Sequence, residues 1–281
     1  MPWRRGVVIK SKRELELMRK AGIVNARALA AAAAEAVPGA TTAEIDAAAA
    51  AVLKAHGATS AFKGYPGPYP YPAVTNVSVN EVLVHGIPGP QRLNDGDIVS
   101  IDCGTIIEGF VADSALTVAV GEISEEAHRL MDVTLESLYA GIDHMRPGMR
   151  TGDVSAAIQA YVEDHGFEVV REYTGHGVGR NMHEDPQVPN YGRAGKGLPL
   201  RPGMTIALEP MVLIGNWETD VLEDQWAVAS RNRKLTAHYE HTVAVTEDGP
   251  LVLTAWGDAL DEDMVIRYNK YFAGRLRPEK E

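Results

Sequence analysis

The chain has 281 residues, of which 45% are apolar and 23% charged, and its formal net charge is −11 at pH 7. A chain of this length and composition is typical of a soluble globular protein, which buries a core without disulfides or structural zinc. The excess of 38 acidic over 27 basic residues argues against a partner that is a nucleic acid, because such binding depends on cations meeting phosphates.

The sequence shows no sign of export or of membrane insertion. Residues 1–20 are charged and interrupted by Pro2, whereas a signal peptide needs an apolar run. No stretch is apolar enough to span a membrane, and the single cysteine, Cys103, cannot form an internal disulfide. We therefore expect a cytoplasmic protein without a membrane partner.

Helix signals occur as two pairs. Ser11 and Thr41 each precede a glutamate by three residues, which is the spacing of a capping box, and an alanine-rich run follows each of them. Proline with glycine follows the first run, and a glycine ends the second. Proline with glycine also separates the two helices of the later pair. The expected helices cover residues 11–36, residues 41–57, residues 124 to about 145 and a segment that ends at residue 166.

Alternating apolar residues predict strands after the first helix pair. The segments are residues 74–84, 97–104 and 110–120, and Glu108 with Gly109 marks a turn between the last two.

Two spacings indicate an internal duplication. Pro38 to Gly57 and Pro147 to Gly166 both span 19 residues, and Leu93–Asp102 and Leu200–Glu209 both place a glycine six residues before a carboxylate. The duplication predicts an α+β protein with a mostly antiparallel sheet that receives acidic residues from both halves. The expected organisation is an N-terminal extension over residues 1–10 and one catalytic domain over residues 11–281, with halves at about 11–121 and 124–254.

Four acidic residues lie in strand-like segments, where a carboxylate is costly unless a cation meets it. They are Asp102, Asp113, Glu209 and Glu240. For each one alone, a salt bridge to Arg or Lys is the simpler interpretation. That interpretation is weaker for all four together, because no Arg or Lys lies within these strand segments.

A glycine-rich segment supplies an imidazole to this set. Residues 173–191 contain His176 and His183, and such a segment lets the backbone bend around a ligand. One imidazole with four carboxylates suits two divalent ions such as manganese, iron(II) or cobalt better than a thiolate zinc site. Four carboxylates would also offset the four positive charges of two such ions.

These motifs resemble type I methionine aminopeptidase, a family of the pita-bread fold. The resemblance is carried by residues 173–191, by Asp102 with Asp113, by Glu209 within ALEPM and by Glu240 within YEHT. It extends over nearly the whole chain and implies two halves related by a pseudo-two-fold axis, with a curved sheet covered by helices. The implied reaction is removal of the N-terminal methionine when the second residue is small, by dinuclear-metal hydrolysis of the first peptide bond.

The resemblance also implies roles for individual residues. The implied metal ligands are Asp102, Asp113, His176, Glu209 and Glu240, of which Glu240 bridges two ions. Glu209 can ligate and still accept the proton of the attacking water. His85 and His183 match the family's two further active-site histidines. His183 would donate a hydrogen bond to the substrate carbonyl, and His85 would position the peptide group.

The side-chain pocket is where the sequence departs from the family. The expected pocket residues are Tyr65, Asn76, His85, Met182, His183 and Trp226, and Phe62, Tyr69 and Tyr71 are further candidates. Residues 63–72 form a longer and more proline-rich loop than is usual in the family. Asn76 replaces a smaller, less polar residue, and Met182 replaces a residue that is often aromatic.

The remaining histidines and the cysteine are interpreted as structural. The histidines are His56, His128, His144, His165, His238 and His241. Cys103 is interpreted as a small core residue, because a soft thiolate is poorly matched to this ligand set.

The expected cofactors are two divalent ions per chain, namely cobalt, manganese, iron(II) or zinc, and the expected partners are N-terminal peptides of nascent proteins, including those at the ribosome. We expect a monomer. One alternative is an Xaa-Pro aminopeptidase of the same fold, although such proteins usually carry an N-terminal domain and only about ten residues precede the first helix here. A second alternative is a non-catalytic peptide-binding relative, against which the complete ligand set argues.

Overall fold

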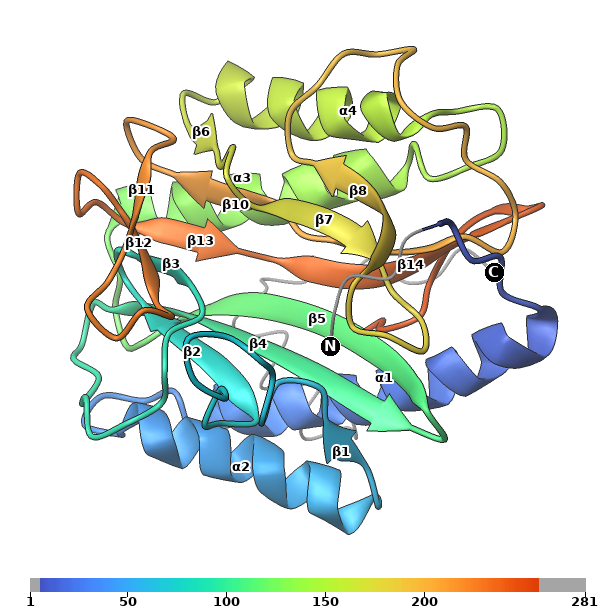
Figure 1. Ribbon diagram of the computed structural model, residues 1–281. Coiled ribbons are helices and arrows are strands. Elements are labelled where there is room, and N and C mark those ends of the chain that lie inside the picture. The colour runs from blue at the N-terminus through green and yellow to red at the C-terminus, as the bar shows by residue number, and fades with distance from the viewer. Residues whose placement is uncertain (1–5, 258–281) are drawn as a thin grey trace.

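Two helical hairpins cover a curved antiparallel sheet (Figure 1). The computed structural model describes residues 6–257. The helices are α1 (Lys12–Ala34), α2 (Thr42–Ala55), α3 (Glu125–Ile142) and α4 (Thr151–Asp164). Within the described residues, no helix combines the length and the apolar character that a membrane crossing requires.

The main sheet contains nine strands. They are β1 (Thr59–Ser60), β2 (Thr75–Val79), β4 (Ile98–Ile107), β5 (Phe110–Ala119), β7 (Thr174–Gly177), β8 (Glu184–Pro189), β9 (Thr205–Leu208), β14 (Glu240–Thr246) and β15 (Gly249–Val252). Their order is β1-β4-β5-β14-β9-β7-β8, while β2 pairs with β4 and β15 pairs with β14. All of these pairings are antiparallel, as expected.

Two three-stranded sheets complete the described structure. One has the order β13 (Thr236–His238), β10 (Met211–Leu213), β6 (Glu168–Val169), and the other has the order β11 (Thr219–Val221), β12 (Val228–Ser230), β3 (Val82–Val84). The first helix pair packs against β2, β4 and β5, and the second packs near β6, β8, β9, β10 and β13. The core therefore lies between the helices and the convex side of the sheets, which leaves the concave side for a site (Figure 1).

The predicted helix starts are confirmed. Ser11 and Thr41 each accept a hydrogen bond from the backbone of the glutamate three residues on, and that glutamate returns one, so both capping boxes form. The third helix ends at Ile142, slightly before the expected Met145. The chain tightens there, because the Met145 N–H bonds to the Ile142 carbonyl at 2.8 Å in a three-residue turn.

The prediction of one strand over residues 74–84 is wrong. The run divides into β2 and β3, which belong to different sheets. Asn80 lies between them with a φ of 55°, and its side-chain amide donates to Asp97 Oδ1 at 2.9 Å. The backbone therefore turns at Asn80, because contacts with a residue 17 positions away stabilise the left-handed conformation.

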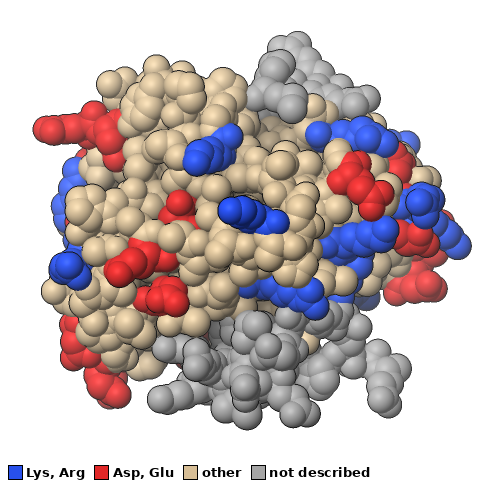
Figure 2. Space-filling model, turned by 90° about the horizontal axis from the view of Figure 1, so that it is seen from below, with Lys and Arg blue, Asp and Glu red and all other residues tan. Residues whose placement is uncertain are grey.

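Charged side chains are mixed on the face drawn in Figure 2. Basic and acidic groups are interspersed over the part of that face that belongs to the described residues, rather than gathered into one patch of a single sign.

Candidate metal centre

Strand register places three of the predicted ligands on one face of the sheet. Asp102 of β4 and Glu240 of β14 both pair directly with Ala115 of β5. Asp113 lies two residues before Ala115 on the same strand. Because side chains alternate along a strand, all three carboxylates point to the same side.

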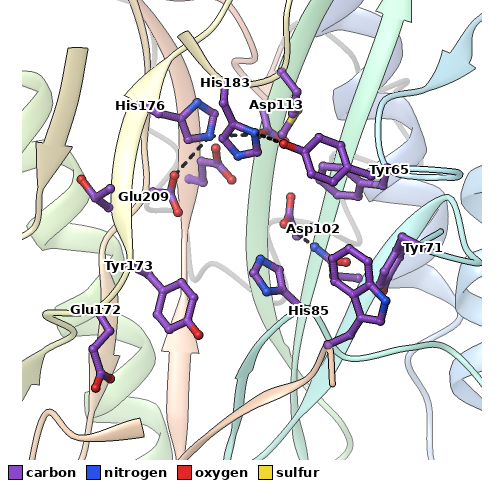
Figure 3. A pocket seen from close by; sticks show the side chains of 16 residues that line it. Tyr65, Tyr71, His85, Asp102, Asp113, Glu172, Tyr173, His176, His183 and Glu209 are labelled. Carbon is purple, nitrogen blue, oxygen red and sulfur yellow. Dashed lines mark hydrogen bonds and ion pairs between the residues drawn. The ribbon is translucent and has the colours of Figure 1, made fainter. Parts of the chain in front are cut away.

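The second half of the chain, to which Glu240 also belongs, adds the remaining two predicted ligands in the same way. Ala207 of β9 pairs with Thr242 of β14 and with His176 of β7. Thr242 lies two residues after Glu240, and Glu209 lies two residues after Ala207. The alternation therefore predicts that His176 and Glu209 share the face of Glu240, and Figure 3 shows the His176 ring and the Glu209 carboxylate next to one another, joined by a dashed line.

The predicted ligand atoms lie close enough to one another to share a metal ion. One ligand atom from each of Asp113, His176 and Glu240 lies within 4.8 Å of the others. His176 Nε2 is 3.8 Å from Asp113 Oδ2 and 3.5 Å from Glu209 Oε1. His176 Nδ1 is 3.0 Å from the Gly177 carbonyl, to which it donates, so Nε2 presents its lone pair to the carboxylates.

Among the described residues, no neighbouring cation balances the negative charge that these four carboxyl groups carry when they are ionised. Burial raises the pKa of Asp102 to about 7. Burial, followed by the charges of neighbouring carboxylates, raises the pKa of Asp113, Glu209 and Glu240 well above the usual values. Within the described part of the chain, no Lys or Arg forms an ion pair with any of the four. The simple salt-bridge interpretation therefore does not hold there.

Three of the carboxyl oxygens are buried without a hydrogen-bond partner among the described residues. They are Asp102 Oδ1, Asp113 Oδ1 and Glu240 Oε1. A buried acceptor without a donor is costly, and a bound cation would remove that cost. Carboxylate oxygens with one neutral imidazole are ligands that hard and borderline divalent ions accept. The residues present therefore fit a metal centre.

A cavity of about 250 Å³ opens beside the cluster (Figure 3). All of the predicted site residues line it, namely Tyr65, Asn76, His85, Asp102, Asp113, His176, Met182, His183, Glu209, Trp226 and Glu240. Phe62 and Tyr71 line it too. Tyr69 does not: its side chain is exposed, and its hydroxyl donates to the Asp224 carbonyl at 2.8 Å. The wall opposite the carboxylates is mainly aromatic.

His183 stands between the metal cluster and the aromatic wall. Its Nδ1 is 2.7 Å from the Tyr65 hydroxyl, and its ring centroid is 4.3 Å from that of His176. Burial lowers the pKa of His183 to about 3, and burial raises the pKa of Tyr65. At neutral pH the pair is a neutral imidazole beside a protonated phenol.

His85 approaches the cavity from the loop that follows β3. Its backbone φ is 60°, which is unusual for a residue other than glycine. Its ring lies edge-on to Tyr173 at 5.9 Å and to Trp226 at 6.4 Å between centroids. Burial lowers the pKa of His85 to about 4, so this imidazole is also neutral at pH 7.

Asn76 contacts the metal cluster through its side-chain amide. It pairs directly with Asp102 across β2 and β4, and its Nδ2 donates to Asp102 Oδ2 at 2.8 Å. The amide that the sequence analysis placed in the substrate pocket is thus also a partner of a predicted ligand.

Four residues near the site were not predicted. Glu172, Tyr173 and Thr174 line the cavity. Tyr173 and Thr174 are the first two residues of the glycine-rich segment 173–191, which could have indicated them, whereas no pattern marks Glu172. His238, which was interpreted as structural, lies with Nε2 3.8 Å from Glu240 Oε2 and has no hydrogen-bond partner for that atom among the described residues.

Comparisons with known proteins agree with this chemistry. Residues 16–247 match the model of metallopeptidase family M24. Methionine aminopeptidase of Clostridium perfringens is 47% identical over 248 residues, which are 88% of this chain and 98% of that protein. The crystal structure of methionine aminopeptidase from Thermotoga maritima has a TM-score of 0.86 and 45% identity, and the match covers 89% of this chain and 99% of that chain. Prolidase from Pyrococcus furiosus, with a TM-score of 0.72 and 26% identity, matches 88% of this chain and 65% of that chain.

Proposed function

Because the chain belongs to metallopeptidase family M24, we propose that it is a metal-dependent aminopeptidase that removes N-terminal methionine from peptides and nascent proteins. One observation carries the proposal: four carboxylates and His176 meet beside a cavity with an aromatic wall. Such a cavity suits an unbranched apolar side chain such as methionine, while the carboxylate end suits a free amine and metal ions.

Asp102, Asp113, His176, Glu209 and Glu240 would hold two divalent ions of cobalt, manganese, iron(II) or zinc. The ions would polarise the scissile carbonyl, lower the pKa of a water molecule and bind the free α-amine. The unpartnered oxygens of Asp102, Asp113 and Glu240 support this assignment, because ligation gives each of them a partner.

The chain's own groups then direct the proton transfers. Glu209 accepts the proton of the attacking water. With the Tyr65 hydroxyl as the donor to His183 Nδ1, 2.7 Å away, the imidazole proton resides on Nε2. His183 Nε2 donates to the substrate oxygen as negative charge develops there. His85, Asn76, Met182 and Trp226 orient the substrate.

We also propose the oligomeric state of the enzyme and the compartment in which it meets its substrate. The five predicted metal ligands and the cavity walls are complete within one chain, so the proposed activity requires no second subunit, and we propose a monomer. A substrate with a free N-terminus and a small second residue is available on nascent proteins in the cytoplasm. Sedimentation of the purified protein with and without ribosomes tests the oligomeric state and the proposed encounter with nascent chains.

The test of the function is peptide hydrolysis after metal removal and return. The chelator-treated protein should be inactive on Met-Ala-Ser and should regain activity with manganese, cobalt, iron(II) or zinc while binding up to two ions per chain. Asp113→Asn should lower metal content and activity together, because it removes one anionic ligand.

Two outcomes would favour other functions. Faster cleavage of Ala-Pro-Ser than of Met-Ala-Ser would favour the Xaa-Pro alternative, for which the likeness to the prolidase fold is the supporting observation. Metal binding without hydrolysis of either peptide would favour the non-catalytic relative.

A further inference from the structure

The segment between β7 and β8 contains His183, which lines the cavity. Hydrogen bonds within this segment end on the carboxylate of Glu184, the first residue of β8. Gly179 N–H donates to the Asn181 carbonyl at 3.1 Å. The backbone and side-chain amides of Asn181 both donate to Glu184 Oε1 at 3.2 Å. Glu184 directly follows His183, so the position of its carboxylate bears on the position of the imidazole.

The other oxygen of Glu184 meets a lysine from the opposite end of the sequence. Lys10 Nζ donates to Glu184 Oε2 at 2.7 Å, and the two side chains are 3% and 1% exposed. Burial alone raises the pKa of Glu184, but the hydrogen bond and the charge of Lys10 bring it below its usual value. The structure therefore contains a buried ion pair 174 residues apart in sequence.

Residues 6–10, which the sequence analysis assigned to an N-terminal extension, are held against this segment. Lys10 N–H donates to the Gly203 carbonyl at 2.7 Å, and Gly6 N–H donates to Asp185 Oδ2 at 2.6 Å. The Lys10 stem covers Gly179 so closely that a Cβ there would lie 2.5 Å from Lys10 Cε. These contacts leave the Lys10 ammonium little freedom.

We propose that Lys10 is a positioning residue for His183. The ion pair with Glu184 fixes residues 178–184, and this segment in turn fixes the imidazole against Tyr65 and His176. Lys10 does not line the cavity, so it acts through the segment and not on the substrate. The effect on catalysis rests on the function proposed above, whereas the effect on the segment does not.

The first test measures the segment without any activity assay. In Lys10→Met, amide hydrogen exchange of residues 178–185 should become about 10-fold faster or more, while exchange in α3 stays unchanged. The matched control is Lys20→Met, which removes an exposed ion pair with Glu108 and should alter neither region. Unchanged exchange in residues 178–185 of Lys10→Met would overturn the proposal.

The second test is a double-mutant cycle with His183→Ala at saturating metal. In the presence of His183, Lys10→Met should lower kcat roughly 10- to 100-fold with little change in KM, because a displaced group loses transition-state contacts. In the His183→Ala protein, the same change should alter kcat by less than about twofold. Equal losses in both backgrounds would show that Lys10 acts only through general stability, and would overturn the positioning role.

The test needs a second variant that retains the fold, because Lys10→Met leaves Glu184 buried as an unpaired charge and can destabilise the protein. The variant Lys10→Met with Glu184→Gln removes both charges and should fold while still showing faster exchange in residues 178–185. Native exchange rates in this variant would contradict the proposal. If the unaltered protein fails to cleave Met-Ala-Ser, the proposed function fails, but the exchange result still decides the role of the ion pair.

Discussion

Glu240 shows, at the scale of single residues, the energetic problem of this cavity. It is buried beside Asp113 and Glu209, one of its oxygens has no hydrogen-bond partner among the described residues, and its pKa is raised mainly by burial. In the metal-free protein these groups retain protons at a pH where the unfolded chain has lost them. Stability must therefore depend on pH and on metal.

The first prediction concerns the metal-free protein between pH 7.5 and 8.5. Asp102 has a folded pKa of about 7, against an ordinary value near 4, and its three acidic neighbours are also raised. The folded state therefore binds more protons than the unfolded state, so the free energy of unfolding should fall as pH rises. The fall should reach up to about 1.4 kcal/mol per pH unit for each proton still held.

This window excludes the buried histidines. Their pKa values are lowered, so they are neutral in the folded state, whereas unfolded histidines titrate near pH 6.5. They therefore raise the free energy of unfolding as pH rises to about 7.5 and add little slope above that pH. Calorimetry of the chelated protein measures the slope, and saturating metal should remove it because the carboxylates are then ionised at every pH in the window. A flat or rising curve without metal would contradict the raised carboxyl pKa values.

The second prediction concerns His183, which we propose donates from Nε2 to the substrate oxygen. His183→Ala should retain its metal but lose kcat by about 10²- to 10³-fold, which corresponds to about 2.7–4 kcal/mol. KM should change little, because the lost hydrogen bond strengthens only in the transition state. Steady-state kinetics with metal analysis decides the matter, and an unchanged kcat would make His183 structural.

At the scale of elements, helix α1 holds the hairpin that carries two predicted ligands. The side-chain amide of Asn25 donates to the Cys103 carbonyl, and Asn25 Oδ1 accepts from Ser114 Oγ. Cys103 follows Asp102 and Ser114 follows Asp113, so a fully buried helix residue contacts the neighbours of both carboxylates.

The third prediction follows from that contact. Asn25→Leu should lower the free energy of unfolding by about 1–3 kcal/mol, because it leaves buried polar groups on β4 and β5 without partners. It should also weaken metal binding, since the hairpin that positions Asp102 and Asp113 becomes less constrained. Denaturant unfolding and metal titration measure the two effects.

Ser11→Ala is the matched control on the same helix. Loss of its cap should cost about 1 kcal/mol with no change in metal affinity, because the Ser11 hydroxyl bonds to Glu14 and, among the described residues, forms no hydrogen bond with β4 or β5. Equal metal affinity in Asn25→Leu and Ser11→Ala would contradict the link between α1 and the site.

Sequence alone predicts those elements whose cause is local. Both capping boxes and the turn at Glu108 and Gly109 depend on residues a few positions apart, and they form as expected. The division of residues 74–84 was missed because it depends on the contact between Asn80 and Asp97. The position of His238 beside Glu240 was missed although the two residues are only two positions apart, a spacing at which alternation along an extended chain places side chains on one side.

At the scale of the whole molecule, the site joins the two halves of the chain. Asp102 and Asp113 come from strands of the first half, and His176, Glu209 and Glu240 come from strands of the second. The α+β pita-bread fold that the sequence predicts is confirmed, and its curved sheet explains how distant carboxylates meet. Only the assembled fold can provide the cavity, because no single half supplies all five residues.

The central claim is that this cavity selects an N-terminal methionine with a free amine and a small second residue. The most direct measurement is kcat/KM of the metal-loaded protein on Met-Ala-Ser, Met-Lys-Ser, Leu-Ala-Ser and formyl-Met-Ala-Ser. Met-Ala-Ser should be cleaved fastest, Met-Lys-Ser and the formylated peptide should resist, and Leu-Ala-Ser should fall behind by roughly 10- to 200-fold, as an apolar pocket allows. Equal rates on Met-Ala-Ser and Met-Lys-Ser, or cleavage of the formylated peptide, would contradict the account.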